Sequence, residues 1–518
     1  MSYWIAVHLP RLSLDALQPN WPEPDAAAAV PGVLHHGVPV AVMERERVVL
    51  ANTPALALGV QAGMRRGGVQ ALSARVVQLE REPAAEAQLM TALALALLHF
   101  SPHVTLHPDP EAATVMIDAG ASVRLFGGHR ALCRAVYARV RRLGVFLQLG
   151  CAPTAFGAAW LAAQPFRRDR RGAMVRPARR ALRPARMARL LDRLPVGMLH
   201  NVADEGWLDG IGCRTVGEVR RLPRAGLRRR LGADVLVRLD QAYGAVPVRF
   251  TWFSAPPAFA QRMELPGRTE SVQGVMAGAQ RLLLALGGWL AVRQAGVTRL
   301  ALRLEHERYR LGCETPATPV TVSLAEPSRD PAHLGRLLQE RLDKVQFTVP
   351  AVGLLLAVEA MQDCLPRSAA LFPDPGGTPA GLGRLLDTLM ARLGRENVLQ
   401  PRPLADHRPE CASRWCPVDE MPARAAAAAA PQAWPARPPW LLAQPLPLAV
   451  QRHRPCHGGP LVLLSRPERI ESGWWDDALA TRDYFVAERA DGLRCWVYRQ
   501  RPGREEGGEY RWFLHGLF

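Results

Sequence analysis

The chain has 518 residues, of which 48% are hydrophobic, a size and composition that exclude a disordered or fibrous protein and allow several packed domains. Its 65 basic and 47 acidic side chains give a formal charge of +18, which favours a polyanionic partner, above all nucleic acid. A compositional origin competes with this interpretation, because Lys344 is the only lysine and the abundant Arg, Ala, Pro and Gly fit GC-rich coding bias.

The sequence indicates no targeting or membrane segment. The first 17 residues carry Arg11 and Asp15 within their apolar stretch and lack a cleavage-site pattern, which argues against a signal peptide. The longest apolar runs, such as residues 282–292, are shorter than the roughly 20 residues that a membrane span needs. We therefore expect a cytoplasmic, nucleoid-associated protein with no membrane partner.

The 9 cysteines are scattered singly and form no CxxC pair, so neither a disulfide framework nor a ribbon-type zinc site is indicated. Five residues of two metal-binding types, His and Cys, do fall in one C-terminal region, but their spacing matches no standard metal motif. They are His407, Cys411, Cys416, Cys456 and His457. We expect no metal ion and no cofactor.

Strands and helices alternate over the first 163 residues, which predicts an α/β domain. The expected elements are a strand at 3–8, a hairpin at 38–51, a helix at 86–100, a strand at 115–125, a helix at 129–143 and a strand at 146–151.

The character of the sequence then changes. Residues 164–245 are Arg-rich and broken by Gly and Pro, which predicts a small helical module. Residues 246–360 alternate again and predict a second α/β domain. Its expected elements are helix 272–294, strands 297–304 and 320–324, helix 332–344 and strand 352–357.

The last part of the chain contains two Pro- and Ala-rich stretches. Residues 361–381 and 421–449 are expected to be linkers, with a helix and extension at 382–420 between them. Residues 450–518 regain aromatic side chains and are expected to fold or to dock on a partner.

Four motifs occur in the order found in one enzyme family. They are residues 50–51 with 57–64 (LA and ALGVQAGM), 125–128 (LFGG), 150–156 (GCAPTAF) and 208–223 (LDGIGCRTVGEVRRLP). Together they resemble the fingers, palm and thumb motifs of Y-family DNA polymerases, and the resemblance covers about residues 3–360. It implies an α/β (α+β) multidomain fold. The implied parts are a palm segment (1–163) with an inserted fingers segment (about 23–75), a helical thumb segment (164–245) and a little-finger segment (246–360).

The resemblance breaks at the positions that carry the chemistry, because nucleotidyl transfer needs clustered carboxylates to hold two metal ions. In the family's first palm strand the leading Asp is a metal ligand, and His8 stands at the matching position. Counting back from Asp118 as the last residue of the family's SIDEAFLD run places Ala113 and Thr114 at the catalytic Asp-Glu pair. If Asp118 is instead the catalytic Asp, Ala119 replaces its Glu, so either alignment leaves the metal site incomplete.

The contacts to the triphosphate are missing as well. Thr53 and Leu56 correspond to the Tyr and Arg of the family's fingers motif, and Ala155 and Ala159 to its palm lysines. An anionic nucleotide without a cation or a metal loses most of its binding energy. We therefore predict that the chain is not an enzyme and that His8 is an ordinary residue at the end of a strand.

Further segments resemble the ImuB branch of this family, the catalytically inactive partner in bacterial damage-induced mutagenesis. They are residues 4–17, 125–128, 405–410 (ADHRPE) and 512–518 (WFLHGLF). The resemblance implies an accessory protein of translesion synthesis that bridges DNA, the sliding clamp, the RecA-like accessory protein ImuA and an error-prone C-family DNA polymerase. Two alternatives stay open. One is an active Y-family polymerase that recruits Asp15, Asp109 or Glu111 as metal ligands, and the other is a generic basic nucleic-acid-binding protein.

We expect damaged primer-template DNA to contact the thumb and little-finger segments. The arginines expected to follow the phosphates are Arg228, Arg229 and Arg230 of the thumb and Arg299 and Arg303 of the little finger. Alternation within residues 297–304 places three leucines on the face opposite Arg299 and Arg303. An ordinary exposed polar face is the alternative.

A clamp-binding peptide is expected just after the little-finger segment. Bacterial clamp ligands resemble Gln-Leu-(Ser/Asp)-Leu-Phe, and here Leu371 and Phe372 supply the apolar anchors while Ser368 replaces the glutamine. The alternative is a linker that packs back on the little finger. Residues 376–518 are the expected docking platform for the accessory protein and the working polymerase, with a self-contained small domain as the alternative.

Overall fold

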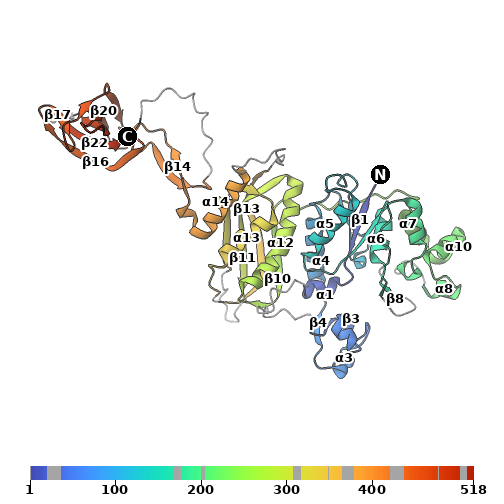
Figure 1. Ribbon diagram of the computed structural model, residues 1–518. Coiled ribbons are helices and arrows are strands. Elements are labelled where there is room, and N and C mark those ends of the chain that lie inside the picture. The colour runs from blue at the N-terminus through green and yellow to red at the C-terminus, as the bar shows by residue number, and fades with distance from the viewer. Residues whose placement is uncertain are drawn as a thin grey trace. The chain divides into compact units, whose positions relative to one another are not determined.

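The structure of the chain is a computed structural model that divides into two compact units, Met1–Arg392 and Leu393–Phe518 (Figure 1). Each unit contains its own hydrophobic cores. The residues that the structure describes are 2–19, 37–168, 174–175, 177–199, 205–306, 317–347, 349–364, 379–420, 437–476, 478–501 and 510–518.

The palm segment is built on a four-stranded antiparallel sheet in the order β5-β6-β1-β7. The strands are β1 (Trp4–His8), β5 (Val104–Leu106), β6 (Thr114–Asp118) and β7 (Gln148–Ala152). Alternation along β1 turns Ile5 and Val7 into one core and Trp4 and Ala6 into another. The first core includes α4 (Pro83–Leu97) and α5 (His129–Arg141), and the second includes α6 (Ala155–Ala163). The short helices α1 (Leu12–Leu17) and η1 (Pro110–Ala112) complete the segment.

The strand expected at residues 115–125 ends at Asp118, so the second half of that prediction is wrong. Asp118 Oδ1 accepts a hydrogen bond from Gly120 N at 3.1 Å, and turns occupy residues 120–127. A short carboxylate that bonds nearby backbone N–H groups competes with the strand ladder in this way. Leu125 of the LFGG motif is consequently 82% exposed.

The fingers segment is a three-stranded sheet, order β3-β2-β4, with two short helices. Its elements are β2 (Val40–Glu44), β3 (Arg47–Ala51), α2 (Thr53–Ala57), α3 (Arg66–Leu72) and β4 (Val77–Glu80). The expected hairpin is confirmed, and its turn residues Arg45 and Glu46 both have positive φ, as a tight two-residue turn requires. The sheet extends past the expected boundary at residue 75, because β4 pairs in parallel with β2.

The thumb segment is helical, as its sequence predicts. Its elements are β8 (Arg167–Arg168), β9 (Met174–Val175), α7 (Pro184–Leu191), η2 (Val196–Leu199), α8 (Glu205–Gly210), α9 (Val216–Arg221), α10 (Arg224–Leu231) and α11 (Ala233–Tyr243). Thr215 and Glu218 form a capping box that fixes the start of α9. The buried face of α11 shares a core with α6 of the palm segment.

The little-finger segment is an antiparallel sheet in the order β10-β13-β11-β12 with helices on one face. Its elements are β10 (Ala260–Thr269), α12 (Val272–Arg293), β11 (Ala295–His306), β12 (Thr318–Ser328), α13 (Pro331–Leu342) and β13 (Ala351–Asp363). Helix α14 (Pro379–Leu393) then docks here. Asp387 on α14 accepts a hydrogen bond from Ala325 N at 2.7 Å and lies 2.8 Å from His333 Nε2. The ends of the linker expected at 361–381 therefore belong to β13 and α14.

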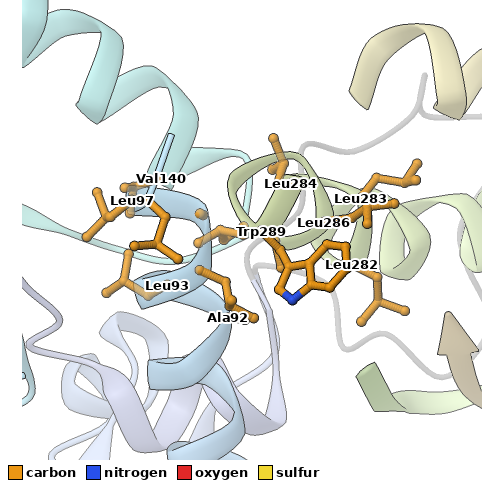
Figure 2. Packing of buried hydrophobic residues seen from close by; sticks show 14 of the residues in the cluster. Ala92, Leu93, Leu97, Val140, Leu282, Leu283, Leu284, Leu286 and Trp289 are labelled. Carbon is orange, nitrogen blue, oxygen red and sulfur yellow. The ribbon is translucent and has the colours of Figure 1, made fainter. Parts of the chain in front are cut away.

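The palm and little-finger segments share one hydrophobic core. Leu93 and Leu97 of α4 gather with Leu282 and Trp289 of α12 in the cluster that Figure 2 shows. The two helices approach so closely that a Cβ atom on Gly288 would lie 1.7 Å from Leu95 O. Only glycine fits at this crossing.

Helix α12 also explains an apolar run noticed in the sequence. Among the described residues it alone is long and apolar enough to cross a membrane, and 78% of its most apolar window is buried inside the protein. A core helix that packs between a sheet and another helix has this composition.

The second unit contains a short hairpin and an antiparallel sheet in the order β17-β16-β22-β21-β20-β18, with β19 also paired to β20. Its elements are η3 (Arg395–Asn397), β14 (Leu399–Pro403), β15 (Ser413–Pro417), β16 (Trp440–Gln451), β17 (Arg454–Cys456), β18 (Val462–Leu463), β19 (Glu468–Ser472), β20 (Ala480–Glu488), β21 (Arg494–Gln500) and β22 (Arg511–Leu517). The linker expected at 421–449 is wrong from Trp440 onward, where β16 begins. Pro445 and Pro447 suggested a linker, but an outer strand tolerates proline.

We predict that Gly288→Ala destabilises the first unit by about 1–3 kcal/mol, because a methyl group at the α4–α12 crossing must push the two helices apart. Gly335→Ala on α13 is the matched control, since its Cβ would meet only ordinary contacts at 3.6 Å. Urea unfolding followed by tryptophan fluorescence measures both. Equal midpoints for the two variants would contradict the close helix crossing.

Candidate functional site

The residues that sequence analysis aligned with the family's metal ligands meet at one end of the palm sheet. The β1–β6 register sets His8 opposite Thr114, and Leu9 N donates to Ala113 O at 2.9 Å. On the other side of β1, Gln148 of β7 stands opposite His8. The fold therefore brings together His8, Ala113 and Thr114, three residues that sequence analysis assigned to one site.

His8 is held by hydrogen bonds to the turn before β6. Its Nδ1 lies 3.0 Å from Ala112 O and 3.1 Å from Thr114 Oγ1. Since a carbonyl oxygen only accepts, Nδ1 carries the proton. Burial lowers the pKa of His8 to about 4, and the positive charge of Arg179 acts in the same direction. The imidazole is therefore neutral at pH 7.

Arg179 is a cation of this site that sequence analysis did not identify. One of its terminal nitrogens donates to Gln148 Oε1 at 2.9 Å and to Gln164 O at 2.5 Å. Its guanidinium also stacks on the Phe166 ring, 4.8 Å from the centroid. No sequence signal marks Arg179, because it reaches the site through contacts that depend on the folded chain.

A second arginine joins the palm segment to the fingers segment. Arg11 lies over the Phe146 ring at 4.7 Å from its centroid, and its Nη2 is 3.5 Å from Thr53 Oγ1. Thr53 begins α2, and Leu56 on the same helix is 54% exposed. Arg11 is thus a cation close to Thr53, which sequence analysis aligned with the Tyr of the family's fingers motif.

The two alanines that sequence analysis aligned with the family's palm lysines lie in a core. Ala155 and Ala159 are both buried on α6, among the residues that pack against the thumb segment. Thr154 caps α6 by accepting from Gly157 N at 3.1 Å, and its hydroxyl donates to Ala242 O of α11 at 2.7 Å. This helix end is therefore used for packing between the palm and thumb segments.

The acidic residues considered as relocated metal ligands have structural contacts. Asp109 Oδ1 accepts from Glu111 N at 3.0 Å and caps η1. Asp15 is buried and accepts from Phe146 N at 2.8 Å, and burial raises its pKa to about 7. Asp118 pairs with Trp4, at the opposite end of β1 from His8.

No group of three or more His, Cys, Asp and Glu side chains that could hold a metal ion occurs in the part of the chain that the structure describes. The five C-terminal residues considered as a mixed site all lie within that part. Cys416 Sγ accepts from Arg414 Nε at 3.3 Å, and Cys456 Sγ donates to Arg454 O at 3.6 Å.

Arg299 and Arg303 lie on the face of the little-finger sheet that carries no helix. Leu300, Leu302 and Leu304 are fully buried on the other face, as the alternation predicts. Arg299 Nε is 3.6 Å from Glu359 Oε2. Arg303 is exposed, and no described carboxylate lies within ion-pairing distance of it.

Arg262 lies in the same row of this face as Arg303, because both stand opposite Leu355 of β13. Arg262 forms ion pairs with two carboxylates. Its Nη1 is 3.0 Å from Glu264, and its Nε is 2.8 Å from Glu305. Of these two arginines, Arg303 is the more available to a phosphate.

Arg228, Arg229 and Arg230 are exposed in the last turn of α10. Cations at the C-terminal end of a helix also stabilise its dipole, so their position fits both DNA contact and a purely helical role. The proposed clamp residues Ser368, Leu371 and Phe372 lie outside the residues that the structure describes.

The C-terminal aromatic side chains divide into two groups. Tyr484, Trp496 and Tyr498 are buried in a core of the sheet. Trp474 and Trp475, on the loop before β20, are 73% and 55% exposed. The second unit thus has both a core of its own and aromatic surface.

We predict that His8 does not titrate between pH 8 and pH 5. A histidine whose folded pKa lies near 4, below the unfolded value of 6.5, lends stability that is full above pH 6.5 and is lost as the pH falls toward 4. The Cε1 resonances of 13C-labelled histidine measure this, with His8 assigned by its absence in His8→Asn, which keeps a donor to Ala112 O. A midpoint above pH 6 would contradict the buried, neutral imidazole.

Comparisons with known proteins found a family model, solved structures and curated relatives that are similar to this chain. A family model described as the impB/mucB/samB family matches residues 28–164. DinB from Sulfolobus solfataricus is 15% identical with a TM-score of 0.36, covering 69% of this chain and 98% of that structure. An insertion ternary complex of Dbh DNA polymerase is 15% identical with a TM-score of 0.35, covering 70% of this chain and 100% of that structure.

Two curated relatives, both named Protein ImuB and from two strains of Caulobacter vibrioides, are 30% identical to the chain over 502 residues. The alignment covers 89% of this chain and 100% of each relative. Similarity over nearly the whole length includes the C-terminal unit as well as the polymerase-like part. The chain therefore belongs to the ImuB family.

Proposed function

We propose that this chain is a non-catalytic scaffold of damage-induced translesion DNA synthesis, which holds DNA while another polymerase performs the synthesis. The observation that carries this proposal is the site formed by neutral His8 with Ala113 and Thr114 at the end of the palm sheet.

Electrostatics support the absence of catalysis. Two metal ions in a polymerase site need several carboxylate oxygens within direct contact distance. Here the ligand positions hold a neutral imidazole, a methyl group and a hydroxyl, and the charge of Arg179 reaches the imidazole. A cation close to the site disfavours divalent ions.

The active-polymerase alternative would need acidic residues, with Asp15, Asp109 and Glu111 as the candidates, to lie near His8 and Asp118 and hold a metal. Asp15 is instead buried against the Phe146 backbone, and Asp109 caps η1. The generic nucleic-acid-binding alternative leaves the second unit, with its own folded sheet, without a role.

The proposed partners are those of a bridging protein. We propose that Leu371 and Phe372 anchor the chain on the sliding clamp, with Ser368 in place of the usual glutamine. The second unit would hold the RecA-like accessory protein ImuA and an error-prone C-family polymerase. Binding to DNA would associate the protein with the nucleoid.

Primer extension tests the loss of catalysis. We predict no template-dependent extension by the purified chain with Mg²⁺ or Mn²⁺, under conditions in which an active Y-family polymerase extends the same primer. The double variant Asp15→Asn and Asp109→Asn is the control. Extension that survives repeated purification and disappears in this variant would establish the active-polymerase alternative.

The open face of the little-finger sheet is the surface that we propose for DNA. Ala260 and Ala357, which stand opposite each other on this face, have small and accessible side chains, whereas Ala301 on the other side of Ala357 is buried. Small side chains let a phosphate backbone approach, and the neighbouring arginines supply positive charge.

We predict that Arg303→Gln weakens binding to primer-template DNA several-fold at low salt and reduces the salt slope by about 1. Arg299→Gln should have a smaller effect, because Glu359 already neutralises part of its charge. Arg262→Gln is the matched control, since two carboxylates occupy this side chain. Fluorescence anisotropy at several salt concentrations measures all three. Equal affinities and slopes for Arg303→Gln and the wild type would rule out this surface.

A further inference from the structure

The loop between β19 and β20 presents two tryptophans to solvent. Trp474 and Trp475 are in edge contact, with ring centroids 4.7 Å apart and an interplanar angle of 81°. Leu479, on the same loop, is 64% exposed. The sheet beside the loop has an aromatic core that holds Trp496, so the exposure of this pair is not shared by all the tryptophans of the unit.

Arg408 anchors this loop through hydrogen bonds. Its guanidinium donates to both carboxylate oxygens of Asp476, at 3.0 and 2.6 Å, and to Ala478 O at 3.1 Å. It also donates to Asp406, at 2.7 Å for the shortest contact, and lies 5.6 Å from the centre of the Trp475 ring. Arg408 is only 5% exposed. A buried guanidinium with two carboxylate partners ties Asp476 and Ala478 to the region of Arg408.

The segment that carries Arg408 is itself connected to the sheet by an ion pair. Glu410, two residues after Arg408, lies 2.9 Å from Arg482 of β20. Gly473 starts the loop with a φ of +89°, and a Cβ there would lie 2.4 Å from Ala478 O. The two tryptophans are therefore positioned in advance, which reduces the entropy lost when a partner immobilises them.

The charges at the base of the loop favour a protein over a nucleic acid as the occupant. Asp406 and Asp476 share the single guanidinium of Arg408, which leaves one excess negative charge there, and the Asp476 side chain is 41% exposed. Glu471 on β19 is neutralised by an ion pair with Arg501. Phosphates would meet carboxylates on approach. A protein with an apolar pocket and a basic rim has the complementary charge.

We propose that Trp474 and Trp475, presented by the loop that Arg408 anchors, insert as a pair into an apolar pocket with a basic rim on a protein partner. This inference rests on the proposed function, because it assigns the partner contact of the second unit to one loop. Paired tryptophans at the centre of an interface are frequent hot spots.

The test uses the full chain and two purified probes, the RecA-like accessory protein and the C-family polymerase, with binding measured by biolayer interferometry. Trp474→Ala with Trp475→Ala should weaken binding to one of the two by at least about 30-fold. Trp440→Ala is the matched control, since Trp440 is 67% exposed on β16 of the same unit. Arg408→Gln keeps both tryptophan side chains but removes the side chain that anchors their loop. This variant should weaken the same complex by a smaller factor.

Unchanged affinities of the double variant for both probes would overturn the inference and leave the scaffold proposal intact. Loss of single-stranded DNA binding alone would also overturn it, since the loop would then serve nucleic acid. If the wild-type chain binds neither probe, the bridging function fails and the inference fails with it. Near-UV circular dichroism of each variant checks that the sheet remains folded.

Discussion

The contact between the backbones of α4 and α12 is the constraint on which the first unit depends. It places the little-finger sheet against the palm segment through a common core. The buried Arg281 and the partly buried Arg139 complete the junction, and Arg139 reaches α12 by donating to Leu284 O at 3.0 Å. Arg281 donates to Leu143 O at 2.8 Å, and Arg139 donates to Ala96 O at 3.0 Å. Both carbonyls lie near the ends of helices, where backbone oxygens lack a partner within the helix.

Hydrogen bonds at the same junction allow the two arginine charges to lie away from water. Burial lowers the pKa of both arginines to about 10, so each remains charged at neutral pH. A buried charge is tolerated when hydrogen bonds replace water, and here backbone carbonyls supply them. The positions of these arginines, and the small residue at the crossing, thus depend on one another.

The end of the palm sheet at His8 is held by neutral hydrogen bonds. His8 Nδ1 and the Thr114 hydroxyl both donate to Ala112 O. A cluster of carboxylates repels itself unless metal ions are present, and His8, Ala113 and Thr114 introduce no such repulsion.

Sequence patterns predicted the elements with strong periodicity. The hairpin at residues 38–51 and the leucine face of β11 follow from alternation alone. Motif alignment assigned His8 and Thr114 to one site, and the structure adds that they stand opposite each other on paired strands. The end of β6 was missed, since one Asp118 hydrogen bond decided it.

Other features depend on contacts that no local pattern contains. Arg179 reaches the site through Gln148 and Phe166, and Gly288 is a glycine only because Leu95 O lies against it. The ADHRPE motif carried the family resemblance without a stated role. In the structure Asp406, Arg408 and Glu410 hold a loop and a strand of the C-terminal sheet.

The composition of β16 bears on the behaviour of the protein at high concentration. From Trp440 to Leu448 this strand pairs with β22 on one side, and no described strand pairs with the other side. Such an edge, with Trp440 and Leu446 exposed, could template pairing with another molecule. Pro445 and Pro447 remove two N–H donors from it. The two prolines thus act against fibre-like association. Replacing them with residues that have an N–H donor would lower the solubility of the protein.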